Sequence, residues 1–134
     1  MSVNKSVLAQ MIRVNHAGEY GARRIYQGQL ALIKDQAEQS AIKEMLAQEE
    51  KHLDYFAEQI KERQVRPTLF LPVWHLAGYA LGLLTAGLGK KAAMACTIAV
   101  EEVIVDHYQE QLDELNQQTE SESELKAKIK QFQA

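Results

Sequence analysis

The sequence is short of cysteine and of positive charge, and each shortage excludes a class of protein. One cysteine, Cys96, stands among 134 residues, which excludes an internal disulfide framework and fits a reducing compartment. Its apolar neighbours favour a small buried residue over a reactive thiol. The formal net charge is −3 at pH 7, so no basic field is available for the phosphates of a nucleic acid. We therefore expect no nucleic-acid partner.

Targeting signals and strand patterns are also missing. The segment from Met1 to Arg13 has neither the apolar core of a secretory leader nor the composition of a transit peptide, rich in Arg and Ser. We expect the chain to start in the cytoplasm or to be already processed. No stretch of useful length alternates apolar and polar residues as a half-buried strand does. We predict a single all-α domain over residues 1–134, because that length supports one hydrophobic core.

Three stretches repeat apolar residues at steps of three, four and seven, and we predict an amphipathic helix for each. They are Ser6 to about Ala37, about Glu38 to Arg63, and Ala92 to about Gln117. The second should end by Arg66, because the residue before Pro67 is pushed out of the α-helical region. The third has an apolar stripe that we expect to face inward, formed by Met94, Ile98, Val105, Tyr108, Leu112 and Leu115.

A polar stretch after the third helix separates it from a short fourth helix. Ser121 with Glu124 forms a capping box, which marks a helix start. The apolar residues that follow at helical spacing, and that we expect to face inward, are Leu125, Ile129 and Phe132. This helix has barely begun when the sequence stops at Ala134. We therefore predict a last helix that is incomplete.

Three glycines, Gly18, Gly21 and Gly28, lie beside the apolar stripe of the first helix. Glycine weakens a helix, so its repeated use here needs a reason. Close approach of another backbone or of a bound group is one reason. The alternative is that the helix is weakened or broken at this point.

Residues 67–89 carry no formal charge and are long enough for a transmembrane candidate. Against a membrane span stand Pro72, His75 and four of the seven glycines of the protein, all within the segment. We predict an apolar helix that lies in a membrane interface or packs on the bundle. Trp74 suits the boundary between lipid and water, and Lys90-Lys91 is available for anionic headgroups. Plain core packing is the alternative.

Each of the three long helices interrupts its apolar stripe with ionisable side chains. They are Glu19 on the first helix, Glu49 and His52 on the second, and Glu101 on the third. A carboxylate in an apolar core costs on the order of several kcal/mol unless it is paired or binds a metal. In helix bundles, inward glutamates with a Glu-x-x-His pair build a dinuclear metal site, because positions i and i+3 of one helix reach the same ion. We therefore predict a carboxylate-bridged metal centre.

The residues leave both the metal and an alternative open. Oxygen-rich ligation with one imidazole per metal suits iron or manganese, but affinity order alone favours copper or zinc. The alternative to a metal is a buried network of Glu–His and Glu–Arg pairs that uses Arg13 or Arg23.

Four segments of the sequence carry a more specific signal. They are Arg13-Val14-Asn15-His16-Ala17-Gly18-Glu19-Tyr20-Gly21-Ala22, Gln48-Glu49-Glu50-Lys51-His52-Leu53, Arg66-Pro67-Thr68, and Ala95-Cys96-Thr97-Ile98-Ala99-Val100-Glu101-Glu102 with His107-Tyr108. Together they resemble the demethoxyubiquinone hydroxylases of ubiquinone biosynthesis, over nearly the whole chain. The resemblance implies a ferritin-like bundle with a di-iron centre that activates O₂ and hydroxylates the ring of 3-demethoxyubiquinol. It also implies a peripheral membrane enzyme whose apolar middle segment admits a polyprenyl tail.

The resemblance assigns metal ligands by position. Those implied are Glu19 as terminal ligand of the first ion, His52 on the same ion, Glu49 as the bridge, and Glu101 as terminal ligand of the second ion. The pattern has two more ligands, a bridging glutamate and a histidine, which would fall four and seven residues after Phe132 and so beyond Ala134. We expect the chain to be a fragment or truncated, or to receive these ligands from elsewhere, and to be inactive alone.

His107 and Tyr108 match a His-Tyr pair that the family uses near the quinone and its electron supply, with core packing as the alternative for Tyr108. The implied partners are demethoxyubiquinol, O₂ and membrane lipid, besides a second copy of the chain or other ubiquinone-biosynthesis proteins. The implied location is the cytoplasmic face of a bacterial plasma membrane, or the mitochondrial inner membrane in a eukaryote.

Two other classes of protein fit the same residues. A non-catalytic quinone- or lipid-binding helical protein would keep the apolar segment and need no metal. A structural bundle would associate through the small-residue face Gly78-x-x-x-Gly82 and would bind neither metal nor quinone.

Overall fold

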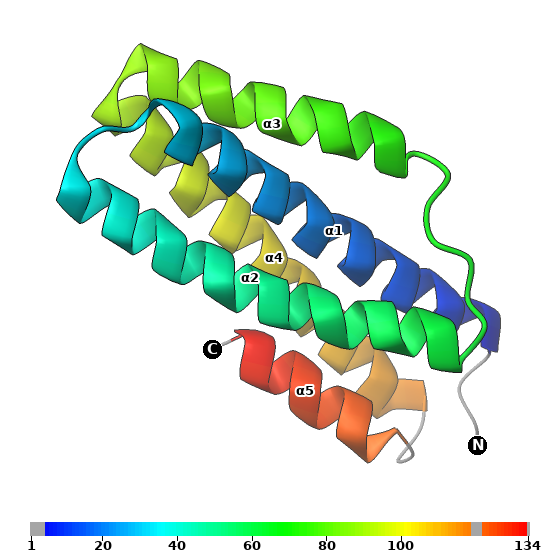
Figure 1. Cartoon of the computed structure of the whole chain (residues 1–134). Coiled ribbons are helices and arrows are strands. Elements are labelled where there is room, and N and C mark those ends of the chain that lie inside the picture. The colour runs from blue at the N-terminus through cyan, green and yellow to red at the C-terminus, as the bar shows by residue number, and fades with distance from the viewer. Residues whose placement is uncertain (1–4, 119–121, 134) are drawn as a thin grey trace.

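The computed structural model describes residues 5–118 and 122–133, which are mostly helical (Figure 1). In chain order the helices are α1 Lys5–Leu32, α2 Gln36–Glu62, α3 Leu71–Leu88, α4 Lys90–Gln118 and α5 Ser123–Gln133. Neither described range contains a strand, so the all-α prediction is confirmed. The predicted cap residue Ser121 lies outside the described residues.

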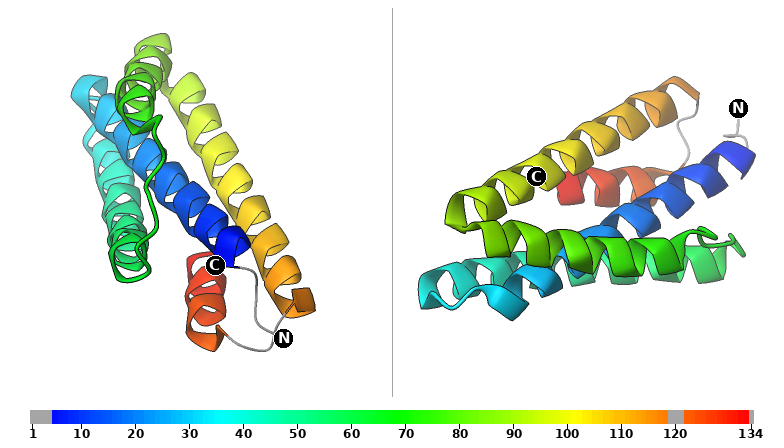
Figure 2. Two further views of the ribbon diagram at one scale, coloured as in Figure 1. Left: turned by 90° about the vertical axis from the view of Figure 1, so that its right-hand side faces the viewer. Right: turned by 90° about the horizontal axis from the view of Figure 1, so that it is seen from above.

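Helix α1 is the central element of the bundle and contacts α2, α3 and α4. Helices α1 and α3 run in one direction, and α2 and α4 run in the opposite direction (Figure 1). Helix α5 packs on α4 and lies at the end of the bundle away from the α3–α4 connection (Figure 2). The apolar helix α3 is therefore an addition on the outer side of α1.

The boundary between α1 and α2 differs from the prediction. Helix α1 ends at Leu32 rather than near Ala37, and α2 begins directly after Asp35. Asp35 has an extended backbone, and its side chain accepts a hydrogen bond from the Glu38 N–H at 3.2 Å, so it caps α2. The predicted boundary was wrong because Ile33, which is buried, continues the apolar stripe past the helix end.

Helix α3 packs on α1 through glycines of both helices. A Cβ atom at Gly82 would clash with the backbone oxygen of Ile25, and one at Gly28 would clash with that of Tyr79. Close approach of another backbone therefore explains Gly28, as predicted, and α1 is unbroken here. Gly78 and Gly82 are buried against α1 within the chain, so this small-residue face does not serve self-association.

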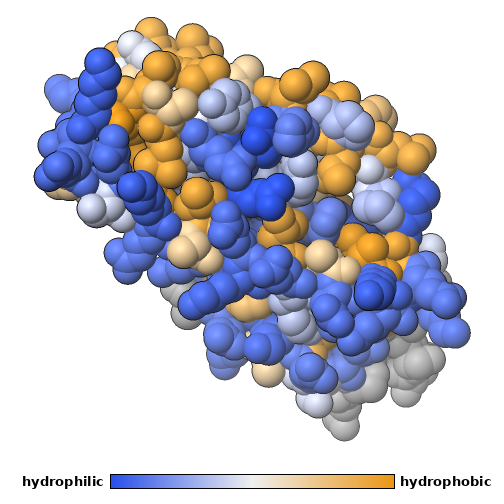
Figure 3. Space-filling view, in the orientation of Figure 1, coloured by the Kyte–Doolittle hydropathy of each residue, from blue (hydrophilic) through white to orange (hydrophobic). Residues whose placement is uncertain are grey.

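The outer side of α3 is apolar and exposed. Only 11% of the residues Leu71–Leu88 are buried. The helix has 18 residues and a mean hydropathy of 1.3, so it is long enough and apolar enough to cross a membrane. Pro72 lies in the first turn, where the missing N–H costs nothing. In Figure 3 hydrophobic residues follow the edge formed by α3, whereas α2 is mainly hydrophilic. The most exposed large apolar residues of α3 are Val73, Leu76, Leu84 and Leu88.

Helix α4 is rotated relative to the predicted stripe in its N-terminal half. Met94 and Ile98 are 53% and 56% exposed, so their predicted inward orientation is wrong. The buried positions are Ala93 and Thr97, one residue earlier in each case. Gln29 of α1 stabilises this orientation, because its amide nitrogen donates to the Ala93 carbonyl at 3.2 Å and its amide oxygen accepts from the Thr97 hydroxyl at 3.5 Å.

Two hydrophobic clusters fill the bundle and leave a polar layer between them. One lies toward α5 and includes Phe56, Tyr108 and the α5 residues Leu125 and Ile129, both buried as predicted. The other lies toward the α1–α2 turn and consists of residues from α1, its C-terminal end, α2 and α4, namely Ala22, Ile25, Tyr26, Ile33, Ile42 and Ala93. Glu19 and Glu49 lie between these two sets along their helices.

Candidate metal centre and adjoining cavities

Glu19 of α1 and the Glu49-x-x-His52 pair of α2 form one cluster of ionisable side chains. Nδ1 of His52 lies 3.5 Å from Oε1 of Glu19 and 3.8 Å from Oε2 of Glu49. One ligand atom from each of the three lies within 4.8 Å of the others. Residues i and i+3 of α2 thus meet a carboxylate of α1, as expected of groups that share an ion.

The two carboxylates of the cluster are buried, and several of its polar atoms lack hydrogen-bond partners in the protein. Glu19 is 1% exposed and Glu49 is 3% exposed. Oε2 of each carboxylate and Nδ1 of His52 are buried without a hydrogen-bond partner among the described residues. Buried polar atoms normally have partners, because an unmet one costs on the order of 1–3 kcal/mol. Carboxylate and imidazole atoms left open toward one another fit a bound cation, and iron is among the metals that accept this donor set.

The predicted alternative was a network of Glu–His and Glu–Arg pairs, and among the described residues its Glu–His part is present and its arginine part is not. Nε of Arg13 donates to the Arg66 carbonyl at 2.7 Å. The guanidinium of Arg23 lies over the Tyr20 ring, 4.8 Å from its centroid, and its Nε has no hydrogen-bond partner. The cluster therefore has Glu–His proximity without a compensating arginine.

Tyrosine hydroxyls from two helices hold the carboxylates near this layer. Tyr108 of α4 donates a hydrogen bond to Oε1 of Glu19, and Tyr26 of α1 donates one to Oε1 of Glu101 at 2.7 Å. Burial and the neighbouring carboxylates raise the pKa of both hydroxyls far above the ordinary value. Both tyrosines thus stay protonated and act as donors.

Glu101, the fourth predicted ligand, is not part of the three-residue cluster. Its side chain is half-buried, and Tyr26 orients it from the α1 side. Its charge still acts on Tyr108, which also contacts Glu19, so the two carboxylates share a neighbourhood. The assignment of Glu101 as a ligand stays a prediction.

Neighbouring side chains brace the cluster from both ends of the bundle. The ring of Phe132 in α5 stacks on the His52 ring at a centroid distance of 4.0 Å and an interplanar angle of 24°. Asn15 and Gln111 exchange two amide hydrogen bonds of 2.7 Å, which tie α1 to α4 one turn from Glu19. These contacts limit the rotamers of the ionisable groups.

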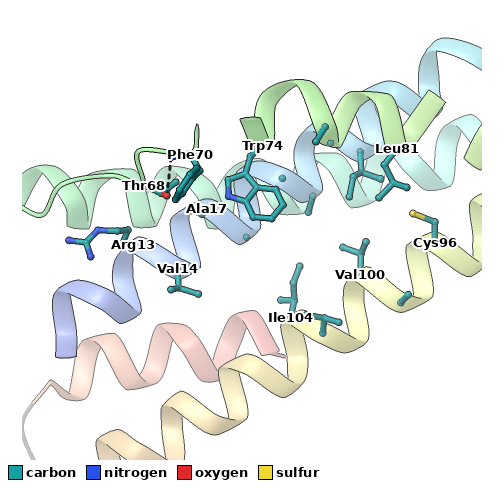
Figure 4. Close-up of a pocket in the computed structure, with 18 residues that line it drawn as sticks. Arg13, Val14, Ala17, Thr68, Phe70, Trp74, Leu81, Cys96, Val100 and Ile104 are labelled. Atoms are coloured by element: carbon teal, nitrogen blue, oxygen red, sulfur yellow. Dashed lines mark hydrogen bonds between the residues drawn. The ribbon is translucent and has the colours of Figure 1, made fainter. Parts of the chain in front are cut away.

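A large apolar cavity of about 690 Å³ lies between α1, α3 and α4. Figure 4 labels Arg13, Val14, Ala17, Thr68, Phe70, Trp74, Leu81, Cys96, Val100 and Ile104 among its lining residues. Arg13 is the one charged residue of the lining, at one end. Phe70, Trp74 and Leu81 are also exposed, so the cavity opens beside the apolar outer side of α3. This large cavity suits a long hydrophobic ligand.

A small cavity of about 180 Å³ lies between the large cavity and the cluster. Its lining residues are Val14, Asn15, Gly18, Glu19, Val103, Ile104, His107 and Tyr108. His107 and Tyr108, predicted near a bound quinone, therefore lie beside the Glu19 carboxylate in one cavity. Their catalytic role stays a prediction.

Sequence reasoning missed several of the residues that shape this site. In the sequence Tyr26 lies on the apolar stripe of the first helix, seven residues after Glu19, whereas its hydroxyl bond to Glu101 depends on the packing of α4. The Asn15–Gln111 pair had a signal, because Asn15 falls on the stripe with Glu19 and Gln111 follows Tyr108 by three residues.

The chain matches a family model over residues 6–134. The family is described as ubiquinone biosynthesis protein COQ7. It is a ferritin-like helical family, and the ferritin-like bundle that the resemblance implies is confirmed.

Curated relatives show the same similarity. A protein of Dictyostelium discoideum, NADPH-dependent 3-demethoxyubiquinone 3-hydroxylase, mitochondrial, is 48% identical over 130 residues, which are 97% of this chain and 60% of the relative. The human protein of that name is 45% identical over 132 residues, 98% of this chain and 61% of the relative. The 3-demethoxyubiquinol 3-hydroxylase of Rhodospirillum rubrum is 50% identical over 128 residues, 95% of this chain and 59% of the relative. The chain thus spans about 60% of the length of these relatives.

Proposed function

This chain belongs to the family described as ubiquinone biosynthesis protein COQ7, and from that membership we propose that it takes part in the O₂-dependent ring hydroxylation of 3-demethoxyubiquinol. The curated relatives are named as hydroxylases of demethoxyubiquinone or demethoxyubiquinol. Because the chain spans about 60% of the length of such a relative, the proposal concerns its part in the whole enzyme.

One observation carries the proposal: a buried Glu–Glu–His cluster with open ligand atoms adjoins a small cavity that borders a large apolar one. Glu19 belongs to the cluster and also lines the small cavity. A ligand with a polar ring and a long apolar tail matches this order of surfaces, with the ring toward Glu19 and the tail between α1, α3 and α4. A quinol with a polyprenyl chain is such a ligand.

In the proposed site Glu19 and His52 would hold one iron, Glu101 would hold a second, and Glu49 would be a ligand of both. Iron held there would supply the activation of O₂ that ring hydroxylation needs. The chain itself contributes position and environment. Tyr108 holds its proton and donates it as a hydrogen bond to Glu19, and the apolar lining keeps bulk water away from the ring.

We place the protein on a membrane surface, with the outer side of α3 toward lipid. The apolar core helix of a soluble protein is mostly buried, whereas only 11% of Leu71–Leu88 is buried. The support here is that α3 is mostly unburied and that the large cavity opens beside its exposed residues. The membrane would be the bacterial plasma membrane on its cytoplasmic side, or the mitochondrial inner membrane in a eukaryote.

The test is metal binding followed by activity. The protein is loaded anaerobically with Fe²⁺, and bound iron is measured by elemental analysis in wild type, Glu49→Ala and Glu50→Ala. Glu50 is the matched control, because it is the exposed neighbour of the buried Glu49. We expect Glu49→Ala to lose its iron and Glu50→Ala to keep it. The same amount of bound iron in all three proteins would contradict the assignment of Glu49 as a metal ligand.

Activity is then measured on a form extended to the length of the relatives. That form should bind about two irons per chain, as the family pattern implies. With O₂ and with NADPH, the reductant in the name of the Dictyostelium discoideum relative, it should place one oxygen atom on the ring of 3-demethoxyubiquinol while the two electrons of NADPH reduce the other to water. Bound iron without product would leave the metal site standing and remove the hydroxylase assignment.

A further inference from the structure

The glycines of α1 fall into two groups with different surroundings. A Cβ atom at Gly28 would clash with the α3 backbone, so helix packing requires glycine there. A Cβ atom at Gly18 or Gly21 would meet nothing within 4 Å. Packing against another helix therefore gives no reason for Gly18 and Gly21.

Helix geometry gives no reason for them either. Gly18 and Gly21 lie inside the unbroken helix α1, and neither has a positive φ. Glycine is the poorest helix former after proline in such an interior position. The fold would accept a better helix former at both sites.

What Gly18 and Gly21 share is a place on cavity walls. Gly21 lines the large cavity, and Gly18 lines both the large and the small cavity. A side chain at either position would project into space that is open at present. Both glycines thus enlarge the cavities at the cost of helix propensity.

The two cavities adjoin at Gly18, which is an exposed residue of α1. The residues that line both are Val14 and Gly18 of α1 and Val103 and Ile104 of α4. Val14 and Ile104 lie on facing helices in Figure 4. Glu19 and Tyr108 line only the small cavity, so Gly18 lies on the border between these two residues and the large cavity.

We infer that Gly18 and Gly21 are specificity-determining residues, Gly18 by leaving open the border between the two cavities and Gly21 by deepening the wall of the large cavity. The missing side chain at Gly18 admits a planar ring to the small cavity. The missing side chain at Gly21 leaves room for an apolar chain. The identity of the ligand, a quinol with an apolar tail, rests on the proposed function.

The experiment uses the full chain and its single tryptophan. Trp74 lines the large cavity, so its fluorescence reports on occupancy there. Two probes separate ring from tail: a 2,3-dimethoxybenzoquinone with a decyl chain, and 1-dodecanol, which has no ring. Dissociation constants for both probes are measured with wild type, Gly18→Leu and Gly21→Leu.

We expect wild type to bind both probes. Gly18→Leu should weaken quinone binding at least tenfold and dodecanol binding less, because Gly18 lines both cavities and dodecanol has no ring to place in the small one, whereas Gly21→Leu should weaken both equally. Unchanged quinone binding by Gly18→Leu would overturn the inference and leave the proposed function intact. A wild-type protein that binds dodecanol but no quinone would overturn the proposed function, and the role of Gly18 with it.

Thermal unfolding distinguishes a role of Gly18 in ligand entry from a role in helix packing. Gly18→Ala should melt at or above the wild-type temperature, because alanine favours the helix and has empty space to occupy. The same variant should bind the quinone several-fold more weakly. A lower melting temperature for Gly18→Ala would show that the glycine serves packing and would overturn the inference. Gly87→Ala is the control, since a Cβ there has ordinary contact with Leu32 at 3.7 Å and Gly87 lines neither cavity.

Discussion

The hydroxyl of Tyr108 donates a hydrogen bond to Glu19, across 89 positions of the chain and between helices α4 and α1. Glu19 is the most buried carboxylate of the described residues, and the Tyr108 hydroxyl is the one side-chain hydrogen-bond donor to it among them. Loss of this hydroxyl leaves Glu19 with less compensation for burial. In metal-free protein, Tyr108→Phe should lower the free energy of unfolding by about 1–3 kcal/mol. Urea unfolding measures the change.

The control for this prediction is Tyr79→Phe. The ring of Tyr79 stacks with Arg24, 4.7 Å from the guanidinium carbon to the ring centroid, and phenylalanine keeps that contact. We expect a change within about 0.5 kcal/mol. Equal losses in the two variants would mean that the Tyr108 hydroxyl has no special part in holding Glu19.

The exposed side of α3 predicts membrane binding that depends on its leucines. Leu76 and Leu84 are 71% and 60% exposed, so serine at these positions should leave the fold intact. Burial of one leucine in lipid contributes about 1.5–3 kcal/mol, and Leu76→Ser with Leu84→Ser should therefore weaken vesicle binding by more than tenfold. Flotation with phosphatidylcholine–phosphatidylglycerol vesicles measures it. Lys43→Ser on the exposed side of α2 is the control, and equal flotation of all variants would contradict the prediction.

The contact between α1 and α3 predicts that alanine is not tolerated at Gly28. Its Cβ would overlap the Tyr79 backbone oxygen, and backbone atoms cannot move aside as a flexible side chain does. Gly28→Ala should lower the free energy of unfolding by about 1–3 kcal/mol despite the better helix propensity of alanine. Thermal or urea unfolding tests this. A Gly28→Ala protein as stable as wild type would show that α3 is not held against α1 in this way.

The ion pair between Arg63 and Glu122 predicts a pH-dependent contribution to stability. The guanidinium donates to both carboxylate oxygens, at 2.6 and 3.1 Å, and these bonds hold the pKa of Glu122 below its ordinary value of 4.5. A lowered pKa in the folded state stabilises the protein above pH 4.5, and the stabilisation is lost as pH falls through the lowered pKa. Glu122→Gln should cost about 0.5–1 kcal/mol at pH 7, with a smaller loss in acid.

A double-mutant cycle tests whether the pair is responsible. In an Arg63→Met background, Glu122→Gln should have little further effect at pH 7. The same loss in both backgrounds would mean that Glu122 stabilises the chain through other groups.

Much of the fold and part of the site follow from local patterns. Helical periodicity identified the long helices, because their inward residues recur at steps of three and four. The same periodicity put Glu19, Glu49 and His52 on inward faces, and the structure brings them together. The burial of Leu125 and Ile129 in α5 was predictable for the same reason.

Features that depend on contacts between distant residues were not predictable. The orientation of Met94 and Ile98 is stabilised by Gln29, which no pattern within α4 reveals. The stacking of Phe132 on His52 joins α5 to α2 and has no local signal. The large cavity likewise lies between three helices. The glycines of α1 that line it are evident in the sequence, but the sequence does not show that they line a cavity.

The opening of the large cavity beside the exposed side of α3 changes how the concentration of a ligand must be counted. A ligand with a long apolar tail is dissolved in lipid and enters this cavity without crossing bulk water, if α3 lies on the bilayer. The occupancy of the large cavity is then set by the number of ligand molecules per lipid molecule in the bilayer and not by the ligand concentration in the whole solution. Adding inert lipid at constant total ligand should dilute the reaction as effectively as removing the ligand.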